Sequence, residues 1–212
     1  MRIILNDHRG TTNFAGALAA LVDGADTLSL AVSYVQMGGW EELRRRARRL
    51  SLARMRMVCT DQFGITQPDA VRRALHSGVQ IRNFTGDVTY HPKVYLAHNG
   101  KGRPTRFLVS SANLSYAAFT DSVEAGVLGE DPTGLHTLSA WFDDLFLNRS
   151  AEFTPEHLRK MEEIWRTAAE GVSNSVGGLS DGSPARLVKS GGTNLIEKEN
   201  RRGETISHRR QG

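Results

Sequence analysis

Three apolar segments that follow one another along the chain most constrain its fold. They span residues 91–96, 106–115 and 122–127. Their composition favours β-strands. Each segment carries polar side chains at or near one end, namely His91, Lys93, Ser111, Asn113 and Glu124. The fold must therefore hold three consecutive strands with reactive or charged residues close to their ends.

The spacing of these polar residues constrains which way they point. His91 and Lys93 are two positions apart, so in a strand both side chains face the same side. Pro92 faces the other side, and proline is tolerated at the start of a strand or on an edge strand. Glu124 lies between apolar neighbours, where a buried carboxylate needs a partner, and the imidazole of a histidine is the expected one. Together these residues predict a site that holds and attacks a phosphodiester.

Short apolar stretches alternate with amphipathic ones elsewhere in the sequence. Further strands are expected at residues 2–5, 27–35, 55–60 and 79–84. Helices are expected from a cap at Thr11 or Thr12 to Val22, from Trp40 to Leu50 after two glycines, from Pro68 to Gly78, at 135–147 and at 155–169. Strands that alternate with helices predict an α/β domain built in layers.

The character of the sequence changes near residue 171. From there to Gly212, glycine, serine, asparagine and scattered charges dominate, with only two apolar pairs. Such a composition cannot bury a core of its own. We therefore predict one domain at residues 1–170 and a flexible Gly/Ser-rich tail or linker at residues 171–212.

Length and composition exclude several classes of protein. The chain has 212 residues, 39% of them hydrophobic, and can bury one substantial core. Cys59 is its single cysteine, which excludes a disulfide framework or a cysteine zinc site and fits a cytoplasmic location. The sequence shows no signal peptide and no apolar run of about 18 residues, so no membrane span is expected. The net charge of +4 is compatible with a polyanionic partner.

Two basic regions are candidates for contact with phosphate. Residues 44–49 place five arginines on an amphipathic helix, which is either a solvated face paired with Glu41 and Glu42 or a phosphate-binding face. Lys101 and Arg103 follow the first of the three polar-ended strands, and we expect them to bind substrate.

The order HxK, then SxN after a strand, then Glu on the next strand resembles the phospholipase D superfamily. Within it the pattern is most similar to nucleases with a single HxK motif, which include metal-independent restriction endonucleases. Residues 91–93 match HxK, Ser111 and Asn113 match the GSxN element, and Glu124 matches the downstream acid. The resemblance implies a layered sandwich with a central mixed β-sheet flanked by helices, over roughly residues 1–170.

Two positions depart from the family pattern. The fuller motif has an Asp five positions after the Lys, where this sequence has His98, and the Gly of GSxN is Ser110. We expect His98 in the loop at residues 97–104. Many nuclease-type members also lack the Asp, so this departure favours a nuclease over a lipase.

The resemblance implies a role for each matching residue. His91 would attack phosphorus and form a phosphohistidine, and His91 of the partner subunit would protonate the leaving oxygen and then activate water. Lys93 and Asn113 would bind the nonbridging oxygens, with Ser111 as a weaker donor. Glu124 would orient His91 and stabilise its charged form. No metal ion or other cofactor is implied, because the lysines supply the charge.

The leading interpretation is an endonuclease that cleaves DNA, in restriction or phage defence. The family usually needs two HxK motifs, so a chain with one is expected to form a symmetric homodimer with a shared active site. No sequence-reading domain is recognisable, so specificity is expected from a fused region or a separate partner such as a helicase. The alternatives are a phospholipase or transphosphatidylase, and a catalytically idle nucleic-acid-binding module.

Overall fold

The structure is a computed structural model that describes residues 1–6 and 13–175 of the chain. It divides into two compact units, Met1–Met161 and Glu162–Gly212. The first unit contains the whole β-sheet and the helices up to the start of the last one. Of the second unit, the structure describes the continuation of that last helix as far as Ser175.

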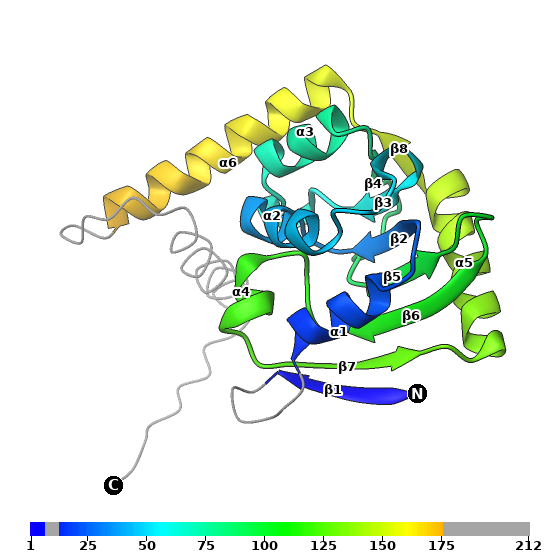
Figure 1. Ribbon diagram of the computed structural model, residues 1–212. Coiled ribbons are helices and arrows are strands. Elements are labelled where there is room, and N and C mark those ends of the chain that lie inside the picture. The colour runs from blue at the N-terminus through cyan, green and yellow to red at the C-terminus, as the bar shows by residue number, and fades with distance from the viewer. Residues whose placement is uncertain (7–12, 176–212) are drawn as a thin grey trace, which may run out of the picture. The chain divides into compact units, whose positions relative to one another are not determined.

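The first unit is built on one eight-stranded mixed β-sheet (Figure 1). The strands are β1 (Arg2–Asn6), β2 (Thr27–Val32), β3 (Arg56–Cys59), β4 (Gln80–Phe84), β5 (Lys93–His98), β6 (Pro104–Ser110), β7 (Glu124–Gly129) and β8 (Ser150–Glu152). Their order across the sheet is β1-β7-β6-β5-β2-β3-β4-β8. Strands β2, β3 and β4 are parallel to one another, and the other neighbours pair antiparallel.

Helices cover both faces of this sheet. They are α1 (Phe14–Val22), α2 (Met37–Arg46), α3 (Pro68–His76), α4 (Tyr116–Thr120), α5 (Pro132–Asn148) and α6 (Pro155–Ser175), with short 3-10 turns at Leu52–Arg54 and Gln62–Gly64. Alternate residues of β5 belong to different cores: Tyr95 packs with α1 and its neighbours, whereas Val94 and Leu96 pack with α5. The predicted α/β class, with a central mixed sheet flanked by helices, is confirmed.

Local sequence explains where most of these elements begin and end. Asn13 caps α1, because its side chain accepts a hydrogen bond of 2.7 Å from the Gly16 N–H. Thr11 and Thr12, the caps expected from the sequence, lie outside the described residues. Pro68 occupies the first turn of α3, where its missing N–H costs nothing, and Gly78 follows that helix with a positive φ of 87°.

Several boundaries differ from the sequence prediction. The helix expected from Trp40 begins at Met37, so the two glycines lie inside α2. Short elements α4 and β8 were not predicted, because neither is long enough to show a periodic pattern. Helix α6 continues through residues 171–175, where the tail was expected to begin. The rest of that tail lies outside the described residues.

The two glycines of α2 allow a close contact that positions the Asn113 loop. A Cβ on Gly39 would lie 2.1 Å from the carbonyl carbon of Leu114, so only glycine fits there. The chain just after β2 adds a short parallel bridge between Val35 and Leu114, and the Gln36 N–H donates to the Leu114 oxygen at 2.9 Å. The loop after β6 is thus fastened to the end of β2 and the start of α2.

Within the part of the chain that the structure describes, no helix has both the length and the apolar composition needed to cross a membrane.

Candidate active site

The strand directions bring five of the seven predicted site residues to one edge of the sheet. Strand β2 ends at Val32, which pairs with Lys93 at the start of the antiparallel β5. Strand β6 ends at Ser110, which pairs with Gly126 near the start of β7. The start of β5, the end of β6 and the start of β7 therefore lie along one edge, which we call the site edge. The site edge carries His91, Lys93, Ser111, Asn113 and Glu124.

Lys93 is the centre of this arrangement. Its side chain is buried, with 5% of the residue exposed. The ammonium donates to His91 Nε2 at 3.0 Å, to the His91 carbonyl oxygen at 3.1 Å and to Ser33 Oγ at 3.1 Å. These contacts use all three of its N–H donors. The predicted shared direction of His91 and Lys93 agrees with this contact.

Ser33 was missed by the sequence analysis. It follows the last residue of β2, and its hydroxyl donates to the Pro92 carbonyl oxygen at 3.1 Å while accepting from Lys93. A polar residue at the end of a buried strand is the signal that singled out Ser111 and Asn113, and Ser33 carries the same signal. Its contact with Lys93 depends on the pairing of β2 with β5, which the sequence does not specify.

Burial changes the protonation of both motif residues. It lowers the pKa of Lys93 to about 8, although the negative charge of Glu124 raises that pKa in part. Burial also lowers the pKa of His91, and the charge of Lys93 lowers it further. At neutral pH, Lys93 is therefore mostly charged and His91 is neutral. With the ammonium donating to Nε2, that nitrogen presents its lone pair and Nδ1 carries the proton.

Glu124 has a different partner from the predicted one. The Ser111 hydroxyl donates to Glu124 Oε2, and Ser111 Oγ accepts from the Ala125 N–H at 3.0 Å. The expected pair of Glu124 with His91 is thus not formed within one chain. The reason is the strand order: β6 lies between β7 and β5, so Ser111 is on the adjacent strand, while His91 is two strands away, about 10 Å.

A hydrogen bond from the backbone fixes the orientation of the Asn113 amide group. Its Oδ1 accepts a hydrogen bond of 3.2 Å from the Tyr34 N–H. No acceptor within the described residues binds its NH₂ group, which keeps two donors for a ligand. Tyr34 also packs edge-on against His91, with ring centroids 6.2 Å apart, and burial raises the pKa of its hydroxyl. Asn113 therefore contributes donors on the β2 side of the site.

Lys101 and Arg103, which we expected to bind substrate, are not brought to the site. They lie in the hairpin that joins β5 to β6, where Asn99 Oδ1 accepts from both of their N–H groups at 3.0 Å. That hairpin follows His98, five residues and about 16 Å along β5 from Lys93. An antiparallel hairpin necessarily lies at the end of the sheet opposite to the start of its first strand.

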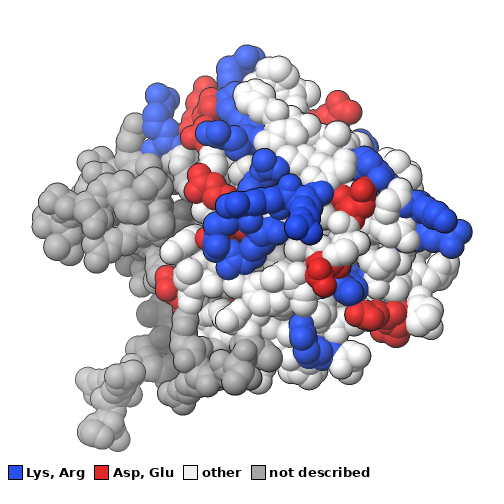
Figure 2. Space-filling view, viewed as in Figure 1, with Lys and Arg blue, Asp and Glu red and all other residues white. Residues whose placement is uncertain are grey.

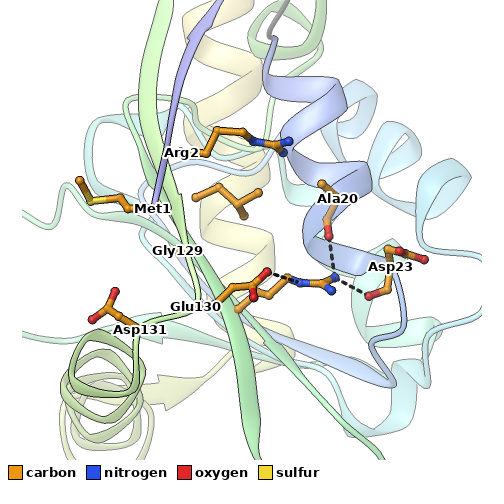
Figure 3. Close-up of a pocket in the computed structure, with 9 residues that line it drawn as sticks. Met1, Arg2, Ala20, Asp23, Gly129, Glu130 and Asp131 are labelled. Atoms are coloured by element: carbon orange, nitrogen blue, oxygen red, sulfur yellow. Dashed lines mark hydrogen bonds and ion pairs between the residues drawn. The ribbon is translucent and has the colours of Figure 1, made fainter.

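The neighbouring Arg106 has a structural role at that same far end. Its guanidinium donates to the carbonyl oxygens of Ala20 and Asp23 at 2.9 and 2.6 Å, and to Glu130 at 3.0 Å (Figure 3). It thereby satisfies carbonyl groups at the end of α1 and joins that helix to β6. The cavity beside it, of about 430 Å³, is lined by residues at the start of β1, at the end of α1 and at the end of β7.

The sequence predicted His98 in a loop, but the structure places it in a strand. It is the last residue of β5, is 4% exposed, and its Nε2 lies 3.0 Å from Ser29 Oγ on β2. Burial lowers its pKa, so it is a neutral partner inside the sheet. Among the residues that the structure describes, no three His, Cys, Asp or Glu side chains are close enough together to hold a metal ion.

A search of protein-family models found no match, and a search of curated proteins found no significant one. Solved structures do match. Nuc, a phospholipase D family member from Salmonella typhimurium, superposes with a TM-score of 0.56 at 16% identity, over 71% of this chain and 95% of that one. NucT from Helicobacter pylori gives 0.53 at 12% identity, over 72% and 98%.

A third match is phosphatidylserine synthase from Haemophilus influenzae Rd KW20, with a TM-score of 0.53 at 13% identity, over 80% of this chain and 46% of that one. These similarities define the fold: a layered α/β sandwich of the phospholipase D type. The predicted fold is confirmed in this finer sense too.

Replacing Lys93 with Met should stabilise the protein at pH 7, because a buried ammonium is costly. The pKa of Lys93 is about 8 in the folded state and near its ordinary value of about 10.4 in the unfolded state. Between these values the unfolded state binds more protons, so the stability of the wild type rises with pH. The advantage of Lys93→Met should therefore shrink from pH 8 to pH 10.

Thermal unfolding of both proteins at pH 7, 9 and 10 measures this difference. Lys101→Met, a change at an exposed lysine, is the matched control and should show no such pH dependence. A Lys93→Met protein whose stability difference from the wild type is the same at every pH would show that Lys93 is not titrating as described.

Proposed function

We propose that this chain is a phosphodiesterase of the phospholipase D type that cleaves DNA, without a metal ion, through a covalent phosphohistidine on His91. The observation that carries this proposal is the Lys93 ammonium, buried and 3.0 Å from His91 Nε2. Within the described residues its three acceptors are all neutral, and no carboxylate forms an ion pair with it. A bound phosphate would supply the missing anion next to the nucleophile.

The first chemical step uses the lone pair of His91 Nε2, which becomes free when the Lys93 N–H that it accepts turns to a nonbridging oxygen of the bound phosphate. The nitrogen attacks phosphorus, a P–N bond forms, and the P–O bond to the leaving nucleotide breaks. The leaving oxygen takes a proton from an acid on the opposite side. In the second step water attacks phosphorus, the P–N bond breaks, and the acid of the first step, now a base, accepts the water proton. The lowered pKa of His91 favours the neutral nucleophile at neutral pH.

The other residues would stabilise the charge of the phosphoryl group. Lys93 and the NH₂ group of Asn113 would donate to the nonbridging oxygens. Ser111 is a weaker donor in this proposal, because its hydroxyl proton is engaged with Glu124. Glu124 would act by holding Ser111 and by keeping Lys93 charged, since its own charge raises the lysine pKa.

The acid of the first step is proposed to be His91 of the partner subunit in a two-fold dimer. Val123, directly before Glu124, is 76% exposed, so apolar surface at the site edge is open for a second copy. The alternative acid is a second histidine of the same chain, His157. It pairs at 2.7 Å with Asp61, which lies just beyond the end of β3. We also propose that the enzyme acts in restriction or phage defence. Its sequence specificity would come from a fused region or from a separate partner such as a helicase.

The purified chain should cleave plasmid DNA and the small diester bis-p-nitrophenyl phosphate in excess EDTA. His91→Ala should abolish turnover, and Lys93→Ala should lower it about 100- to 1000-fold, as expected for loss of a donor to the transition state. The control is His136→Ala, which removes an exposed histidine of α5.

The rival functions predict other outcomes of this assay. Activity that requires added Mg²⁺, or that survives His91→Ala, would refute the mechanism. Hydrolysis of phosphatidylcholine vesicles with intact plasmid would favour a phospholipase. DNA binding without cleavage of either substrate would favour an idle binding module.

Subunit mixing tests the shared site. Wild-type and His91→Ala chains, mixed and allowed to exchange, should give activity that falls with about the square of the wild-type fraction, because a mixed dimer lacks one of the two roles. A linear fall after confirmed exchange, or a fully active monomer in sedimentation, would contradict the shared site. Loss of activity in His157→Ala would then identify the acid within the same chain.

A further inference from the structure

Five arginines form a basic surface on α2 and the turn after it. They are Arg44, Arg45, Arg46, Arg48 and Arg49, which we call the arginine surface. All of them except Arg46 are exposed. The space-filling view shows the densest group of basic side chains in the middle of this face, where Figure 1 shows α2 (Figure 2).

Neighbouring groups neutralise only part of this charge. Glu42 forms ion pairs with Arg45, at 2.6 Å, and with Arg46. For two of the five arginines, these ion pairs agree with the predicted solvated helix face, in which arginines pair with nearby glutamates. Arg44 lies over the Trp40 ring at 6.0 Å, and Arg48 and Arg49 have no ion pair with any residue in the described ranges. Within the described residues, no carboxylate forms an ion pair with these three guanidinium groups.

The surface is hollowed, so that several guanidinium groups line one depression. Its volume is about 630 Å³, and it lies between the end of α1 and the end of α2. Four of the five arginines line it, and Asp23 is the one carboxylate among the described residues that line it. A concave basic surface suits a polyanion, because guanidinium groups on its walls can each donate to a different phosphate.

The arginine surface is on the same side of the sheet as the candidate active site. Lys93 and Tyr95 share one face of β5, and the Tyr95 ring contacts Phe14 of α1 at 5.6 Å. Helix α2 lies on this side and begins at the Asn113 loop, through the contact of Gly39 with Leu114. The helix therefore leads from the site edge towards the arginines.

The distance along α2 fits a nucleic-acid strand. A helix rises 1.5 Å per residue, so Arg44 lies about 10 Å along the axis from Met37. In duplex DNA one strand carries one phosphate per about 3.4 Å of helix axis, so 10 Å of this axis spans about three phosphates. The arginine surface would thus contact phosphates several positions away from the site edge.

We propose that the arginine surface binds the backbone of the DNA strand on one side of the scissile phosphate, independently of sequence. This inference rests on the proposed function, and it specifies where on the protein the uncleaved part of the substrate binds. The contacts release counterions, so they strengthen binding of long substrates at low salt and leave the chemistry at His91 unchanged.

The test compares a triple variant, Arg44→Gln/Arg48→Gln/Arg49→Gln, with the wild type. It keeps the two arginines that pair with Glu42. The control, Lys101→Gln/Arg103→Gln/Arg159→Gln, removes the same charge from exposed positions outside the arginine surface. For all three proteins kcat/KM is measured on bis-p-nitrophenyl phosphate, on a three-nucleotide DNA and on a 20-nucleotide DNA. Binding of the 20-nucleotide DNA is measured from 50 to 200 mM salt on the His91→Ala background, where no cleavage occurs.

The triple variant should match the wild type on the two small substrates and lose at least about tenfold in kcat/KM on the 20-nucleotide DNA. The slope of log K against log salt should become shallower by about 2, since each lost contact to a single strand contributes about 0.7. The control variant should lose much less kcat/KM on the 20-nucleotide DNA than the triple variant does. A triple variant with wild-type kcat/KM and slope on the long DNA, or one no weaker than the control, overturns the proposal.

Other outcomes separate the possible failures. A wild type that hydrolyses no diester refutes the proposed function, while the binding measurement still decides whether the arginine surface holds DNA. A triple variant that binds DNA normally but loses binding to vesicles of anionic phospholipid refutes the DNA proposal in favour of a membrane surface. An unchanged unfolding midpoint establishes that each variant is folded.

Discussion

The buried ammonium of Lys93 is the interaction on which the rest of the site depends. A lysine at 5% exposure with neutral acceptors is costly for a fold of this size, and ordinary proteins avoid it. Here the cost is limited by three hydrogen bonds and by the charge of Glu124. The same burial keeps His91 neutral. The groups that destabilise the folded chain are thus those that would attack and hold a phosphate.

A second constraint is the fastening of the Asn113 loop to the end of β2. The glycines of α2 permit backbone contact with Leu114, and the Tyr34 N–H orients the Asn113 amide. The chain directly after β2 therefore contributes to the site twice, through Ser33 at the ammonium and through Tyr34 at the amide. Because α2 starts at this same point, it also connects the site to the arginine surface.

Much of this arrangement could be predicted from the sequence, because it follows from local rules. The period of two in a strand predicts that His91 and Lys93 lie side by side, and the polar ends of consecutive strands predict a shared edge. The spacing of strands and helices predicts the α/β class. The position of Lys101 and Arg103 was also implied locally, because a hairpin returns the chain from the far end of its first strand. Their closeness in sequence to Lys93 favoured a place at the site, but the structure has them in the hairpin beyond His98.

The remaining errors concern partners that only the strand order decides. Ser33 meets Lys93 because β2 pairs with β5, and Glu124 meets Ser111 because β6 separates β7 from β5. No single-sequence pattern encodes which strands become neighbours across such distances. The cap of α1 was missed for a simpler reason: Asn13 is as good a cap as the threonines before it.

Detection of the covalent intermediate tests most directly the proposal that His91 is the nucleophile. The protein is mixed with a short DNA diester, denatured in alkali during turnover, and digested for mass spectrometry. If His91 is the nucleophile, the peptide that contains it should carry phosphorus together with the nucleotide fragment that was not expelled, in an adduct stable in alkali, lost in brief acid, and absent from the His91→Ala protein. Steady turnover with no adduct, or an adduct on another residue, would contradict it.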